Sequence, residues 1–369
     1  MKSIKIDKFL FISIFIFYII SILSIKSAST YLSSNLGNLV LKQSIWYLIG
    51  ILLIFIILKI DKNIFYKYAY PIYFINCLLL LGLLFLAPSI NGSKCWYNIL
   101  GFSFQPSEFM KISLILLYSK TLGEFNKKKS IYFKDELFLF MKIFIIFLIP
   151  SILTFLEPDT GAIIMYLVIT LFCLFVSKVR IRWFIFLFSF IILFGIFFIS
   201  FYLLKQDLFI DILGNKLFYR MDRLINWKNG SGMQLENSII AISSSGILGF
   251  GFNSTPIYFP EAGTDFIFSV FASNFGFLGG SLLIIYLCLF DIYLINLCGR
   301  KLSVCDKSFI VGVVGIIFYQ QIQNIGMTIG LLPITGITLP FISYGGSSLL
   351  SYMILIGIVL NITKEKTRY

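Results

Sequence analysis

One carboxylate stands where a polar loop meets a long apolar run, at the end of the segment Phe259-Pro-Glu-Ala-Gly-Thr-Asp265. A carboxylate in this setting can accept a proton from a hydroxyl nucleophile if apolar neighbours such as Phe266 and Phe268 raise its pKa. The chain contains no histidine, so the commonest general base and the commonest metal ligand are both missing. We therefore predict that Asp265 is the catalytic base.

A second ionisable pair occurs in the segment Gln105-Pro-Ser-Glu-Phe-Met-Lys111, which opens an apolar helix. Glu108 and Lys111 are three residues apart and so lie on one helix face. Two interpretations stay open. The pair is either a local ion pair in a capped helix, or it binds substrate, because Lys111 lies about one turn inside the apolar span, where a charge is costly.

A third carboxylate, Asp159, lies in the segment Glu157-Pro-Asp-Thr-Gly161 at the start of another apolar run. Asp is a common N-cap residue, and that role alone would explain its position. The unpaired N–H groups of helix N-termini also suit an anion such as pyrophosphate. Asp159 is therefore a second candidate for substrate binding.

Four further polar residues are candidates for binding phosphate or sugar. Arg220 and Arg223 could hold phosphate oxygens, or else contact lipid headgroups. Gln234 lies in the polar segment 230–238 of the same loop. Ser343 lies in an uncharged stretch rich in Gly and Pro, from Gly330 to Ser348, and could donate to a sugar or serve close helix packing.

The composition predicts an all-α integral membrane protein. The chain is 59% hydrophobic and 18% aromatic, which exceeds the apolar content of soluble domains. Ten apolar stretches approach the length that a bilayer requires. They cover residues 9–25, 44–60, 70–88, 107–122, 138–156, 160–176, 183–204, 266–290, 309–331 and 342–362. We predict about ten transmembrane helices in a single polytopic membrane domain, 1–369, with one long extracytoplasmic loop, 205–264, between helices 7 and 8.

The charges set the predicted orientation. The formal net charge is +13, but the bases are spread over short connections, so they indicate topology and not nucleic-acid binding. Most of them lie on one side if both termini are cytoplasmic. The acidic residues named above then fall at the outer face, where we expect the function to lie.

These segments, in this order, resemble the SEDS family of cell-wall polymerases, which includes RodA and FtsW. The matching stretches are 105–111, 157–161, 234–249, 260–268 and 331–348. Residues 333–336 and the short termini are more similar to RodA, whereas residues 260–262 are more similar to FtsW, and RodA is favoured. Gly263, Cys95 and the pair Ser273-Asn274 depart from the family pattern.

The resemblance implies ten transmembrane helices in the bacterial cytoplasmic membrane and polymerisation of lipid II into glycan strands. It also implies a divalent cation and, as partner, a class B penicillin-binding protein acting as transpeptidase. The essential family aspartate maps onto Asp265, and two further acids map onto Glu108 and Asp159. Because only oxygen ligands are available there, a cation held by Glu108 and Asp159 would be Mg²⁺ or Mn²⁺.

On this basis we expect an inverting glycosyltransferase that uses a donor linked to undecaprenyl pyrophosphate. The alternatives are a lipid II flippase and a scaffold that only anchors another enzyme. A transporter should place ionisable residues near the midplane of several helices, whereas here they cluster at the outer ends, which favours the enzyme.

Overall fold

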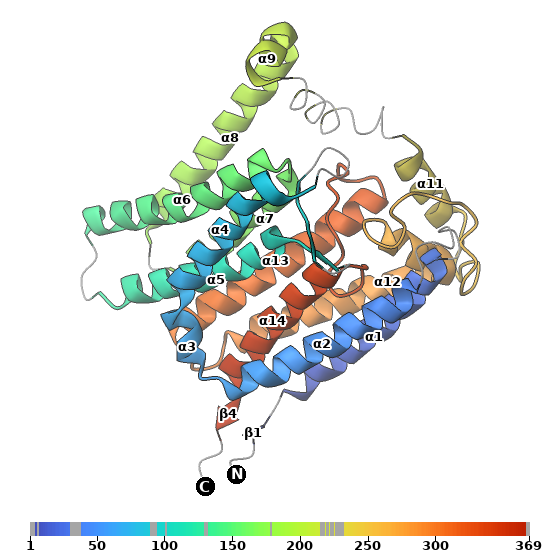
Figure 1. Cartoon of the computed structure of the whole chain (residues 1–369), viewed down its shortest axis with the longest axis horizontal. Helices are drawn as coiled ribbons and strands as arrows, with labels where there is room; N and C mark the ends of the chain where they lie inside the picture. The colour runs from blue at the N-terminus through green and yellow to red at the C-terminus, as the bar shows by residue number, and fades with distance from the viewer. Residues whose placement is uncertain are drawn as a thin grey trace.

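The computed structural model describes residues 4–5, 7–29, 38–88, 94–99, 102–128, 132–177, 179–214, 218, 221, 225 and 232–366. These residues are almost all helical (Figure 1). The helices are α1 (Lys8–Ser29), α2 (Leu39–Lys59), α3 (Lys62–Lys67), α4 (Ala69–Leu86), α5 (Pro106–Asn126), α6 (Phe133–Leu156), α7 (Thr160–Phe175), α8 (Ile181–Leu204), α9 (Gln206–Leu213), α11 (Gly232–Ser243), α12 (Ile267–Leu297), α13 (Val304–Thr328) and α14 (Gly346–Thr363). Two short antiparallel pairings join β1 (Ile4–Lys5) to β4 (Glu365–Lys366) and β2 (Tyr97–Ile99) to β3 (Phe102–Phe104).

Eight of the described helices are long and apolar enough to cross a membrane: α1, α2, α4, α6, α8, α12, α13 and α14. Each of the ten predicted apolar stretches overlaps a helix, which confirms the all-α class. The count of ten spans stays a prediction, because α7 has only 16 residues and α5 carries several charges. The β1–β4 pairing places the two ends of the chain side by side (Figure 1).

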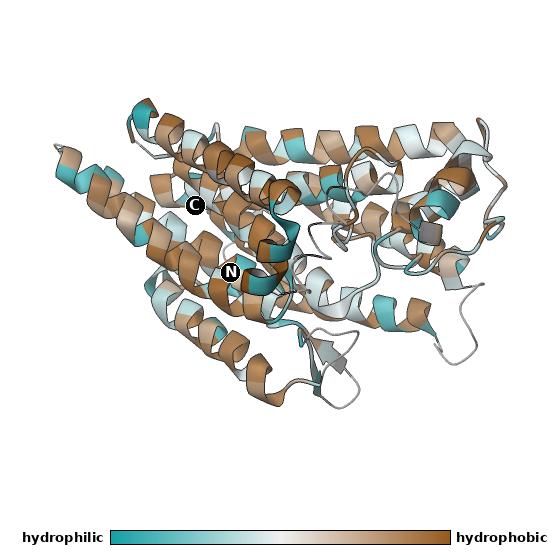
Figure 2. Cartoon of the chain, turned by 90° about the horizontal axis from the view of Figure 1, so that it is seen from above, coloured by the Kyte–Doolittle hydropathy of each residue, from teal (hydrophilic) through white to brown (hydrophobic). Residues whose placement is uncertain are grey.

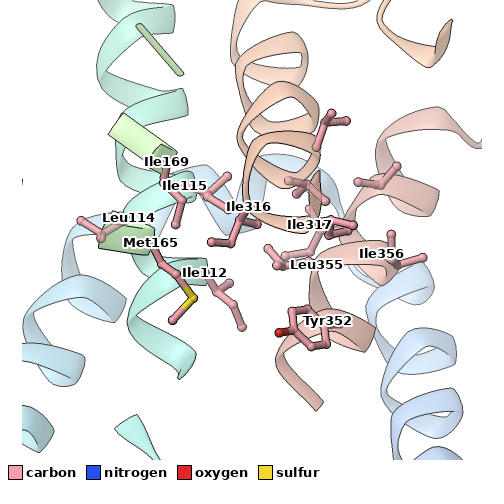
Figure 3. Packing of buried hydrophobic residues seen from close by; sticks show 14 of the residues in the cluster. Ile112, Leu114, Ile115, Met165, Ile169, Ile316, Ile317, Tyr352, Leu355 and Ile356 are labelled. Carbon is pink, nitrogen blue, oxygen red and sulfur yellow. The ribbon is translucent and has the colours of Figure 1, made fainter. Parts of the chain in front are cut away.

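The centre of the bundle is formed by α5, α13 and α14. These helices are mostly buried, with α1 and α2 on one side and α4, α6 and α7 on the other (Figure 1). Figure 3 shows apolar side chains of α5, α7, α13 and α14 meeting in this core. Hydrophobic residues also cover the outside of the helices, while hydrophilic residues gather mainly at helix ends and connections (Figure 2). This distribution is that of a protein whose surroundings are lipid.

The first turns of α8 pack against α6 and α7 through Trp183 and Phe184, whereas the rest of α8 and α9 stand apart from the bundle (Figure 1). Few residues of α8 are buried. The predicted loop 205–264 lies between α8 and α12 and contains α9 and α11. The side of the membrane that this loop faces stays a prediction.

Helix α12 is interrupted at Gly276, whose backbone (φ 66°, ψ −166°) is not helical. A Cβ atom on Gly280 would lie 3.5 Å from Cβ of Ala272, although eight residues of straight helix would separate these positions by about 12 Å. The segment 267–275 therefore folds back beside the main helix. Backbone groups freed at the break are paired with the loop 246–251, for example Phe277 N with the carbonyl oxygen of Gly246 (3.0 Å). The predicted single run 266–290 is thus two helical segments.

Candidate functional site

The predicted base lies in a loop that is fastened to the Gly- and Pro-rich loop 330–345. The Ser343 hydroxyl donates to the carbonyl oxygen of Thr264 (2.6 Å) and accepts from Leu339 N (2.9 Å). Tyr344 N donates to the carbonyl oxygen of Gly263 (2.9 Å). Ser343 therefore joins the two loops, and its predicted contact with substrate stays a prediction.

Asp265 is partly buried and lies beside loop 330–345. Burial raises the pKa of its carboxyl from 3.8 to about 7, and the negative charge of Glu261 contributes in the same direction. A Cβ atom on Gly336 would lie 3.4 Å from Oδ2 of Asp265, and the backbone of Gly336 is left-handed (φ 70°). Glycine at position 336 thus allows loop 330–345 to pass close to the carboxylate. A carboxyl with a pKa near 7 suits proton transfer at neutral pH.

Asp159 lies at the start of α7, which packs against loop 330–345. It caps α7 by accepting from Ala162 N (3.0 Å). Its Oδ2 atom accepts from Gln105 Nε2 (3.2 Å) and Ser107 Oγ (3.3 Å), so that it also connects α7 to the start of α5. The capping prediction is confirmed. A role in binding substrate stays a prediction.

The start of α7 packs against loop 330–345 at Gly161, where a Cβ atom would lie 3.3 Å from the carbonyl oxygen of Thr335. The next residue, Gly336, is equally close to Asp265, because a Cβ atom there would lie 3.4 Å from Oδ2 of Asp265. Residues 335–336 therefore lie beside both the start of α7, which Asp159 caps, and the carboxyl of Asp265. One loop thus adjoins two acid-bearing segments from distant parts of the chain.

Glu108 and Lys111 form the predicted ion pair, with 2.6 Å between Oε2 and Nζ. The Lys111 side chain is fully buried, and its ammonium group lies 5.0 Å from the ring centroid of Tyr352. Ser351 Oγ donates to Glu108 Oε2 (3.2 Å). In this arrangement Lys111 neutralises Glu108 inside the bundle. A direct contact of Lys111 with phosphate stays a prediction.

Two buried residues at this site carry no predicted role. Neither carboxyl oxygen of Glu157 has a hydrogen-bond partner in the described part of the chain. Burial, reinforced by the charge of Asp159, raises the pKa of Glu157 to about 9, so this group is protonated at neutral pH. Asn324 lies on α13 and donates to the carbonyl oxygen of Asp265. Its signal in the sequence was an amide inside an apolar helix.

The remaining predicted residues lie in the long loop. Arg220 and Arg223 are outside the described residues. Gln234 is in the first turn of α11 and is partly exposed. One turn later, Ser238 Oγ donates to the carbonyl oxygen of Thr328 (2.8 Å), which attaches α11 to the C-terminal end of α13.

Comparison with known proteins gives a match over almost the whole chain. Residues 7–368 match the family described as Cell cycle protein, FtsW/RodA/SpoVE. The chain belongs to this family. Its predicted SEDS membership is thereby confirmed.

Curated relatives in the FtsW/RodA/SpoVE family match the chain along nearly its full length. The probable peptidoglycan glycosyltransferase FtsW of Wigglesworthia glossinidia brevipalpis is 35% identical, in an alignment that covers 96% of this chain and 92% of the relative. Stage V sporulation protein E of Bacillus subtilis is 32% identical over 339 residues, which cover 88% of this chain and 86% of the relative.

Two solved structures share the fold. A chain from a peptidoglycan synthase complex superposes with a TM-score of 0.78 at 24% identity, and 97% of each chain is covered. Rod shape determining protein RodA of Thermus thermophilus gives a TM-score of 0.70 at 24% identity, covering 97% of this chain and 96% of RodA. The assignment to the RodA branch of the family stays a prediction.

Proposed function

We propose that this chain is a peptidoglycan glycosyltransferase that polymerises lipid II into β-1,4-linked glycan strands. Relatives in the FtsW/RodA/SpoVE family that are named probable peptidoglycan glycosyltransferases support the proposal. The observation that carries it is the carboxyl of Asp265, which lies beside loop 330–345 and whose pKa burial raises to about 7. Such a group can accept the proton of a sugar hydroxyl.

In the proposed reaction the 4-hydroxyl of the acceptor sugar attacks the anomeric carbon of the donor. The new C–O bond forms on the face opposite to the bond that breaks, so the configuration inverts. The hydroxyl proton passes to Asp265, and undecaprenyl pyrophosphate leaves with the electron pair. General-base assistance of this kind contributes about 10² to 10⁴ in rate.

The departing pyrophosphate requires positive groups. The positive ends of the helix dipoles of α5 and α7 favour an anion, and Lys111 offsets the charge of Glu108 beside them. Arg220 and Arg223 are proposed to hold phosphate oxygens. These groups would stabilise charge that develops on the leaving group.

A divalent cation is proposed at Glu108 and Asp159. Burial raises the pKa of Asp159, and the negative charge of Glu108 raises it further. Because a cation would relieve this repulsion, the two carboxyls fit a cation in part. Among the described residues no group of three or more His, Cys, Asp or Glu side chains could hold a metal ion. The remaining ligands would therefore come from the substrate. When bound, Mg²⁺ or Mn²⁺ would neutralise the pyrophosphate.

Removal of the cation should abolish polymerisation. We expect glycan synthesis to stop in excess chelator and to return when Mg²⁺ or Mn²⁺ is added. Metal affinity, measured by calorimetry, should rise when lipid II is present, because the substrate supplies ligands. Full activity in excess chelator would show that cationic side chains carry the pyrophosphate charge alone.

The pH profile should show the titration of Asp265. Because the base must be ionised, the rate should fall about tenfold per pH unit below pH 7 and level off above it. Glu261→Gln removes a neighbouring negative charge, so the acid limb should move to lower pH while the plateau stays unchanged. An acid limb near pH 4 in the unmodified protein would contradict the assignment.

The proposed setting is the bacterial cytoplasmic membrane, with both termini in the cytoplasm. The structural neighbour from a peptidoglycan synthase complex supports a partner in cell-wall synthesis. We propose a class B penicillin-binding protein, whose transpeptidase would cross-link the strands made here.

A lipid II flippase is the second candidate, and one observation favours it. Asp291 is buried within α12, where Gln321 Nε2 donates to its Oδ1 atom (3.3 Å). Acids inside transmembrane helices are common in transporters. The acids described above, however, lie at helix ends beside the outer loops, which favours chemistry at that face.

One experiment separates these functions. Purified protein is incubated with lipid II in the absence of any penicillin-binding protein, and glycan polymer is analysed by gel electrophoresis. The proposal expects polymer. Movement of lipid II across vesicle membranes without polymer would establish the flippase instead.

A further inference from the structure

The amide of Asn324 bridges the two loops that form the site. Its Nδ2 atom donates to the carbonyl oxygen of Asp265 (2.7 Å) and to the carbonyl oxygen of Ile337 (2.8 Å). The side chain is fully buried. One side chain on α13 therefore holds both the residue that carries the predicted base and the loop that passes beside its carboxylate.

Helix α13 is itself firmly held, so it can serve as a fixed reference for both loops. Its inner end is capped by Ser303, which accepts from Asp306 N (3.2 Å). Within the bundle, Gln321 donates to Asp291, and near the outer end Gln323 Nε2 donates to the carbonyl oxygen of Pro333 (2.9 Å). Asn324 directly follows Gln323 and lies about one turn beyond Gln321.

We propose that Asn324 is a positioning residue that sets the orientation of Asp265 for proton transfer. A primary amide has two N–H groups and can satisfy two carbonyl oxygens at once, which no apolar residue can do. Losing the bridge would release the peptide of Asp265 from α13 and admit water to its carboxyl. This inference rests on the proposed function, in which Asp265 is the base.

A second buried asparagine, away from the site, offers a matched control. Asn361 on α14 is also buried, and its Nδ2 atom donates to the backbone carbonyls of Ile57 and Ile60 at the end of α2. In both residues the amide oxygen has no hydrogen-bond partner in the described part of the chain. Asn324→Ala and Asn361→Ala therefore delete the same kind of bridge, and only the first lies at the site.

The test measures kcat and KM for lipid II, with the pH profile, in both variants. Asn324→Ala should lower kcat by about 10²-fold with little change in KM, since a displaced reacting group costs that much. Its acid limb should move to lower pH, because Asp265 becomes more hydrated. The charged neighbour of Asp265 is Glu261 on its own loop, and neither the outer half of α13 nor residues 330–345 carry a charge. Asn361→Ala should retain kcat and the acid limb.

Two outcomes would overturn the inference. In the first, Asn324→Ala keeps the kcat of the unmodified protein. In the second, Asn324→Ala and Asn361→Ala lose the same fraction of kcat and the acid limbs of their pH profiles do not move. Either result would indicate that Asn324 has a structural role only. If Asn324→Ala does not fold, Asn324→Ser replaces it, because the serine hydroxyl can bond to its own helix but cannot reach both carbonyls. Activity in Asp265→Asn would refute the proposed function itself, whereas an inactive Asp265→Asn beside a fully active Asn324→Ala refutes only the positioning role.

Discussion

Asp265→Asn should leave a folded, membrane-inserted protein that makes no measurable glycan. The amide has the shape of the carboxyl but cannot accept the hydroxyl proton, and loss of a general base costs about 10² to 10⁴ in rate. The fold should survive, because Asn324 donates to the backbone carbonyl of Asp265 and not to its side chain. Polymer formed from lipid II by the purified variant is the measurement.

Glu261→Gln is the control for this experiment. Glu261 lies on the same loop, is exposed, and accepts from Thr264 Oγ1 (2.6 Å). Its amide variant changes the local charge by the same amount as Asp265→Asn but should still polymerise lipid II above pH 7. Measurable glycan synthesis by well-folded Asp265→Asn would remove Asp265 from the role of base.

The sequence could predict the helices because their positions depend on local composition. A helix in lipid needs about 20 apolar residues, so each run marks an element without knowledge of its neighbours. The positions where helices start also depend on local sequence. Residue types alone predict Pro106 at the first position of α5 and Asp159 as the cap of α7. The candidate base could be located for the same reason, since a carboxylate at the edge of an apolar run is visible in the sequence.

The fold-back of α12 could not be predicted in this way. Gly276 adopts a conformation that suits glycine, yet glycine also occurs in straight membrane helices. The break is stable because the loop 246–251 supplies partners for the freed backbone groups, and that loop precedes it by about 25 residues in the chain. Only the three-dimensional contact of Gly249 with Gly276 shows that the two segments belong together.

The sequence could not predict the contacts around the acids either, because the partners are far apart in the chain. Asn324 and Asp265 are separated by 59 positions, and Ser343 and Thr264 by 79. An amide or a hydroxyl in an apolar helix indicates a buried hydrogen bond but does not name its partner. The sequence therefore identified candidate groups, whereas the structure shows which loops hold them.

Lys111→Met should destabilise the protein strongly and weaken binding of lipid II. The ammonium group is fully buried 2.6 Å from Glu108, so its removal leaves a carboxylate with Ser351 as its remaining polar contact. Breaking a buried ion pair by removing one partner costs about 3 to 5 kcal/mol. Thermal unfolding of the purified protein measures this effect, and titration with lipid II measures the affinity.

The double variant Glu108→Gln with Lys111→Met separates structure from binding. If the two residues act only as a pair, removing both should be less harmful than the sum of the single changes, and lipid II affinity should recover with stability. If Lys111 also offsets pyrophosphate charge, the double variant should regain stability but still bind lipid II weakly. Lys128→Met breaks the exposed pair with Asp135 and should change neither property, because exposed pairs contribute little. Unchanged lipid II affinity in Lys111→Met would exclude the phosphate role and leave the lysine as the counter-charge of Glu108.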